Sequence, residues 1–136
     1  MTAPLHPSDL TTQGEASSAD MLSQSGLDLL GAGEYAGAAR AFRAAIAADA
    51  THVEAHHGLT RALREAGHFE AAVAAALALT VLTPLDALAH TSLSIALQKA
   101  GHVPEAEAAA ARARILEWKQ QLAEGSKASG EGEFRG

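Results

Sequence analysis

Histidine is the residue type whose spacing first suggests chemistry in this sequence. His52 and His56 are four residues apart, so both would face one side of a helix, with Glu54 between them. Zinc would require a third or fourth protein ligand, and in this region only the adjacent His57 could supply one.

The histidines also recur at a fixed distance along the chain. His56 is followed 34 residues later by His90, and His68 is followed at the same distance by His102. Recurrence of this kind indicates a structural role that is used twice. We therefore predict no metal site and no cofactor.

Catalytic patterns are missing from the sequence. It has no cysteine, no glycine-rich phosphate loop and no nucleophile–base arrangement. Glu105 and Glu107 open a predicted helix, where negative charge is favoured by the helix dipole. We predict that the chain is not an enzyme and has no catalytic residues.

Composition and charge narrow the class of protein. The chain has 136 residues and a net charge of −6, which argues against nucleic-acid binding. Apolar residues make up 48% but aromatic residues only 4%, so much of the core must be alanine packed between helices. The most apolar stretch, residues 69–82, is shorter than the roughly 20 residues that cross a bilayer. We expect a cytoplasmic protein without membrane insertion.

Three similar phrases reveal an internal repeat: "GAGEYAGAARAF", "EAGHFEAAVAAA" and "KAGHVPEAEAAA". Their glycines, Gly33, Gly67 and Gly101, are 34 residues apart. Other positions keep the same register, namely Leu29, Leu63 and Leu97; Gly26, Thr60 and Ser94; Tyr35, Phe69 and Val103; and Ala38, Ala72 and Ala106. A fixed period of this length is typical of a stacked repeat architecture.

Each repeat reads as two helices joined at its glycine, which can adopt the left-handed conformation that ends a helix. Pro84 would end the second helix of the middle repeat. The pattern predicts helices over residues 20–31, 35–48, 53–66, 69–82, 87–100 and 104–123.

The pattern resembles the tetratricopeptide repeat (TPR) family, with departures at Ser25, Ala50, His56, His90 and Trp118. The resemblance implies an all-α fold, a right-handed superhelical stack of three helix-turn-helix units with an extended C-terminal helix. We assign the units to residues 19–52, 53–86 and 87–123, and predict disorder for residues 1–18 and 124–136. Trp118 replaces a helix-ending proline, so the last helix is expected to run on and cover the final repeat; the alternative is a docking site for a partner.

The resemblance also implies a non-enzymatic module that holds a peptide or protein partner in a concave groove lined by the first helix of each unit. We predict that the groove is lined by Leu27, Glu54, His57, Arg61, Arg64, Leu88, Thr91, Ile95 and Gln98, with Ser23 and Leu30 also on the first helix. Arg61 and Arg64 could hold a carboxylate of the partner. The alternative is that both arginines lie on a solvated face.

One function of the family is not expected here. TPR co-chaperones grip the acidic tails of heat-shock chaperones through lysine, asparagine and arginine at set groove positions. The matching positions in this chain are occupied by Ser23, Leu27, Gly58, Leu88 and Ser92, which cannot form such a clamp.

A second surface is predicted on the outer side of the middle repeat, where the second helix has few charges. The outward positions are Ala71, Ala74, Leu77, Ala78 and Val81. A contiguous apolar surface favours self-association or docking in a larger complex, as a structural subunit or assembly factor. The alternative is a mild, solvated patch of small side chains.

Overall fold

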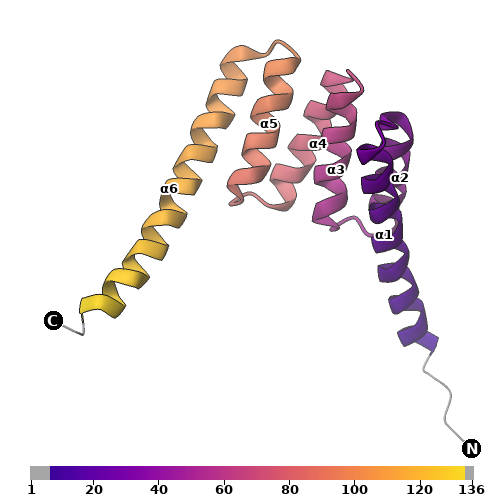
Figure 1. Cartoon of the computed structure of the whole chain (residues 1–136), viewed down its shortest axis with the longest axis horizontal. Coiled ribbons are helices and arrows are strands. Elements are labelled where there is room, and N and C mark those ends of the chain that lie inside the picture. The colour runs from indigo at the N-terminus through magenta and orange to yellow at the C-terminus, as the bar shows by residue number, and fades with distance from the viewer. Residues whose placement is uncertain (1–6, 134–136) are drawn as a thin grey trace, which may run out of the picture.

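Six helices in successive antiparallel pairs make up the computed structural model, which describes the backbone of residues 7–133 and the side chains of residues 18–126 (Figure 1). In chain order they are α1 (Pro7–Gly31), α2 (Tyr35–Ala48), α3 (Val53–Glu65), α4 (Phe69–Leu82), α5 (Ala87–Lys99) and α6 (Val103–Glu133). The described residues contain no strand. The all-α prediction and the four inner helices are confirmed, with bounds that differ by one residue or none.

The first and last helices are longer than the sequence predicts. α1 begins at Pro7 rather than near residue 20, and α6 continues to Glu133 rather than ending near residue 123. A proline suits a first helical position, and neither extension contains a further proline or a glycine with positive φ. This helical backbone differs from the disorder predicted for the two ends, of which residues 1–6 and 134–136 lie outside the described residues. The domain boundaries at residues 19 and 123 stay predictions.

The three repeated glycines end the first helix of each pair. Gly33, Gly67 and Gly101 have φ of 78°, 85° and 87°. The next amide in each repeat donates to the carbonyl of the repeated leucine five residues earlier, as from His68 to Leu63 at 2.9 Å. This is the Schellman arrangement, which requires a left-handed residue and explains why the glycine and the leucine recur together.

The way the helices contact one another curves the stack. Each helix packs against the next, and α1 also contacts α3 while α3 contacts α5. Among the described residues, α2, α4 and α6 make no such contacts with one another. Because the first helices lie closer together than the second helices, α1, α3 and α5 form the inner, concave side.

The two ends of the stack are more polar than its inner helices. Ala55, Leu59 and Ala62 of α3 are buried, and so are the residues 34 positions later in α5. The matching positions in α1 are exposed and are occupied by Met21, Ser25 and Asp28.

At the other end, α6 shows the same change. Glu107 and Arg114 are exposed, whereas the matching residues of the earlier repeats are at least half-buried: Ala39 and Val73, and Ile46 and Thr80. In the described residues, mostly polar exposed side chains thus replace at both ends the buried ones of the inner helices.

Candidate functional site

The histidines that suggested chemistry are engaged in hydrogen bonds within the fold. His56 Nε2 donates to the Ala50 carbonyl at 2.8 Å, and His90 Nε2 donates to the Pro84 carbonyl at the same distance. Both rings therefore fix the loop that precedes their own helix. The structural role predicted for this repeated position is confirmed.

His52 connects α1 to the beginning of α3. Its Nδ1 accepts the Ala55 amide at 3.2 Å, which caps the N-terminus of α3, and its Nε2 lies 2.8 Å from Asp20 Oδ1 in α1. Because Nδ1 accepts, the proton is on Nε2, which donates to Asp20. His52 and His56 are thus both occupied, and the described residues bring together no group of three or more metal-ligating side chains.

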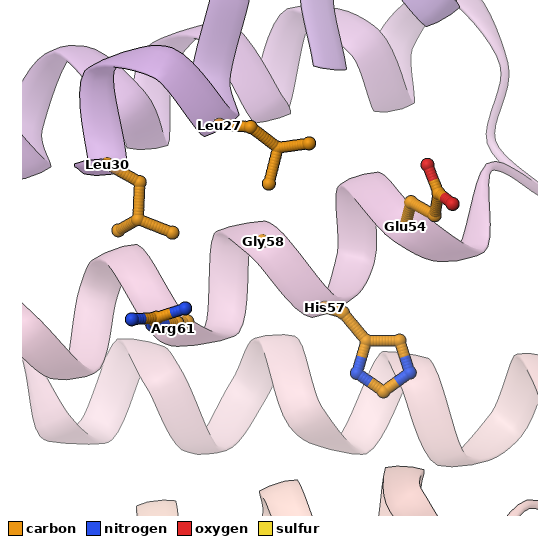
Figure 2. Close-up of a pocket in the computed structure, with 6 residues that line it drawn as sticks. All are labelled: Leu27, Leu30, Glu54, His57, Gly58 and Arg61. Carbon is orange, nitrogen blue, oxygen red and sulfur yellow. The ribbon is translucent and has the colours of Figure 1, made fainter. Parts of the chain in front are cut away.

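A pocket of about 370 Å³ lies between α1 and α3 on the concave side. Figure 2 shows Leu27 and Leu30 pointing from α1 towards α3, with Glu54 and Arg61 on α3. The pocket is lined by Leu27, Leu30, Glu54, His57, Gly58 and Arg61. It therefore combines an apolar wall from one repeat with ionisable groups from the next.

Glycine is required at position 58 by packing inside the protein and not by the space in the pocket. A Cβ built on Gly58 would lie 2.3 Å from the Phe42 ring, and one built on Gly26 would lie 2.7 Å from the same ring. Phe42 is fully buried. The close approach of α1 and α3 around this ring therefore depends on a glycine in each helix.

His57 is the titratable group of the pocket whose pKa is shifted. Burial lowers its pKa below the usual value of 6.5, Asp86 opposes this by raising it, and His56 lowers it further. Its Nε2 lies 4.0 Å from Asp86 Oδ2 at the beginning of α5, and Figure 2 shows the ring pointing away from Leu27 and Leu30. The neutral ring is therefore favoured in the folded protein.

A second hollow, of about 210 Å³, lies between α5 and α6. It is lined by Thr91, Ser94, Ile95, Ala110, Ala113, Arg114 and Glu117. The four residues from α6 are not predicted from the sequence, because the groove was expected to be lined by first helices alone. Arg114 indicates in the sequence that this part of α6 is exposed, because it stands where the earlier repeats have the less polar Ile46 and Thr80.

The predicted groove residues are thus divided between two hollows. Leu27, Glu54, His57 and Arg61 meet in the first, and Thr91 and Ile95 in the second. Arg64, Leu88 and Gln98 line neither. Ser23 is buried, so its short side chain does not line the groove as predicted.

The predicted outer surface of the middle repeat is exposed along α4. Leu77 and Val81 are exposed by 49% and 81%, and Ala71, Ala74 and Ala78 are exposed as well. Nothing in the described part of the chain covers this stripe. Its role as an interface stays a prediction.

No helix in the described residues is long and apolar enough to span a bilayer.

Comparisons with known proteins agree with the repeat architecture. A family model described as tetratricopeptide repeat matches residues 29–94. The search of curated proteins found no match.

Several solved structures share the fold. The type III secretion translocator chaperone SycD of Yersinia enterocolitica is 19% identical, with 82% of this chain and 88% of that chain covered and a TM-score of 0.69. MamA is 22% identical over 79% of this chain and 63% of that chain, with a TM-score of 0.73. This chain thus spans less than two thirds of MamA.

The second TPR of Spaghetti (RPAP3), bound to an HSP90 peptide, is 19% identical, with a TM-score of 0.71 and coverage of 78% of this chain and 98% of that chain. The repeat spacing, the paired helices and the family match lead to one conclusion. The chain has a tetratricopeptide repeat fold, and its residues 29–94 match the family model.

Proposed function

We propose that this chain is a non-enzymatic module that binds a peptide or protein partner on its concave side. The observation that carries the proposal is the pocket between α1 and α3, where Leu27 and Leu30 lie opposite Glu54, His57 and Arg61. An apolar wall beside a few oriented polar groups is typical of a binding site. Arg61 is exposed at this pocket and is available to a carboxylate of the partner.

The solved structures with this fold support the proposal. SycD has been seen with a peptide of the translocator YopD, and the Spaghetti domain with an HSP90 peptide. We do not expect the HSP90 tail itself to bind here. Leu27, Gly58 and Leu88 stand at positions where a carboxylate clamp requires basic or amide side chains.

A capture experiment with paired variants tests the groove. We expect Arg61→Glu with Arg64→Glu to abolish partner capture from a lysate of the native host, followed by mass spectrometry. The control is Arg40→Glu with Arg43→Glu, an equal change of charge at two exposed positions on α2. A partner that both double variants retain, or that both lose, would contradict groove binding.

A second candidate function rests on the exposed stripe of α4. We propose that Leu77, Val81 and their exposed alanine neighbours mediate self-association or docking in a larger complex. Light scattering should then give a dimer that Leu77→Glu converts to a monomer. A wild-type chain that stays monomeric at high concentration rules out self-association through this stripe.

A further inference from the structure

Helix α6 has a second apolar side that does not pack against the other helix of its repeat. Ala106, Ala109, Ala113 and Leu116 are buried against the stack. Ile115, Trp118 and Leu122, here called the α6 stripe, are exposed by 44%, 59% and 52%. At about 100° per residue the stripe is centred nearly opposite the buried side. A surface helix normally has polar residues there.

The position of Trp118 corrects one sequence prediction. The extension of α6 was expected to lie over the final repeat, but residues 117–126 are all exposed. The only helix that α6 contacts, within the described residues, is α5. In Figure 1 the extension projects beyond α5 rather than folding back across it. The fold therefore does not explain the stripe.

Basic side chains border the α6 stripe on both sides. Lys119 is four residues after Ile115, and Arg114 is four residues before Trp118, so each is a neighbour of the stripe on the helix surface. Arg112 lies beside Lys119 on the same edge. All three are exposed.

A hollow adjoins the edge formed by Arg112 and Lys119. It has a volume of about 450 Å³ and is lined by Leu85, Arg112, Leu116, Lys119 and Gln120. Leu85, from the loop after α4, is itself 75% exposed. The stripe, the basic edge and this partly apolar hollow thus form one continuous surface.

We propose that the α6 stripe docks an amphipathic helix of a partner protein whose apolar side is bordered by acidic residues. The apolar residues of the partner would cover Ile115, Trp118 and Leu122, as in other helix pairs that bury an apolar seam. Its carboxylates would pair with Arg112, Lys119 and Arg114. This proposal does not rest on the concave groove, which uses other residues.

Charge argues against two other molecules as occupants of the α6 stripe, a second copy of the chain and an anionic membrane. Two copies paired through the stripe would bring the arginines and the lysine of one chain beside those of the other, and like charges at such a seam repel. An anionic membrane would meet a chain of net charge −6, with Glu117 and Glu124 on the same helix. A single helix bordered by acidic residues would contact only the stripe and its basic edges, Arg112, Lys119 and Arg114, whereas a membrane would present negative charge to the whole acidic chain.

Trp118 is the single tryptophan of the chain, so its fluorescence reports on the stripe. The probe is a designed helical peptide without tryptophan, with leucine along one side and glutamate bordering it. The control peptide has lysine in place of the glutamate. We expect the glutamate peptide to shift the Trp118 emission to the blue and to bind roughly tenfold more tightly than the lysine peptide.

Charge reversal sharpens the test. Arg112→Glu with Lys119→Glu should reverse the preference between the two peptides, whereas Arg40→Glu with Arg43→Glu, with the same change of net charge, should leave it intact. Because the four positions are exposed, the helical circular dichroism of every variant should match the wild type.

Three results would overturn the proposal. The first is equal binding of the two peptides, or binding of neither. The second is a blue shift with vesicles that contain phosphatidylserine but not with the glutamate peptide. The third is a wild-type dimer in light scattering that Leu122→Asp dissociates, which would assign the stripe to a second copy.

Discussion

Gly58 of α3 leaves the space that the ring of Phe42 fills. The ring lies so close that a Cβ on Gly58 would approach it to 2.3 Å, and Gly26 of α1 leaves room for the same ring. One aromatic side chain of α2 thus sets how closely the first two repeats pack. The pocket between α1 and α3 lies directly beside this contact.

Gly58→Ala should destabilise the protein because the fully buried ring of Phe42 cannot move aside without disturbing its neighbours. We expect the free energy of unfolding to fall by about 1–3 kcal/mol in urea titrations. In a Phe42→Leu background the same change should cost less, because the two sites are coupled.

Gly37→Ala is the matched control for Gly58→Ala. A Cβ on Gly37, within α2, would meet Leu29 at an ordinary 3.5 Å. This change should stabilise the helix by about 0.5–1 kcal/mol. Equal effects at Gly37 and Gly58 would contradict the packing argument.

Gly67→Ala tests the turn of the middle repeat. Because Gly67 has a φ of 85°, we expect alanine to lower the free energy of unfolding by about 1–2 kcal/mol, although nothing lies within 4 Å of the added Cβ. Gly67→Asn should cost less, since asparagine tolerates this conformation better than alanine does. If asparagine and alanine are equally destabilising, backbone conformation is not the cause.

His57 should make stability depend on pH. Its pKa in the folded protein is lowered by burial, whereas in the unfolded chain it lies near 6.5. The folded state therefore binds fewer protons between the two values, and this contribution to stability, complete above pH 6.5, is lost as the pH falls through the lowered pKa.

Urea titrations of wild type and His57→Gln across this range measure the effect. We expect the advantage of the wild type over the variant to shrink as the pH falls below 6.5. A difference in free energy of unfolding that does not vary with pH would show that His57 titrates alike in both states.

His52→Ala should destabilise the protein because it removes both the cap of α3 and the hydrogen bond to Asp20. We expect a loss of about 1–2 kcal/mol in thermal or urea unfolding. His52→Asn, which can still cap the helix, should lose less. The control is His68→Ala, since exposed His68 precedes α4 without a side-chain cap, and it should change stability by less than about 0.5 kcal/mol.

The repeat could be predicted from the sequence because its signals are local. Gly33, Gly67 and Gly101 mark the ends of helices through their own backbone conformation, and the leucines before them accept the hydrogen bonds of those turns. Periodicity therefore predicted four helices to within one residue. The ends carry no such signal, so α1 and α6 are longer than expected.

The site was harder to predict because it depends on what each helix packs against. Leu27 and Arg61 meet because neighbouring repeats are related by a regular step, which the spacing indicates. Ser23 and Arg64 follow the same spacing, yet one is buried and the other lies outside the pocket. Arg114 and Glu117 line a hollow together with residues of α5, and this contribution of a second helix follows from packing within the last repeat.

The polar residues at the two ends of the stack lie outside the packing of the middle repeat, so the number of repeats can change without a change in that packing. Ser25 and Asp28 at one end, and Glu107 and Arg114 at the other, are exposed at positions where the middle repeat has buried or partly buried residues. A duplicated copy of residues 53–86 would meet familiar neighbours on both sides. Duplication of this unit would therefore lengthen the chain by one repeat and add one position to the groove. The residues at the two ends would keep their sequence.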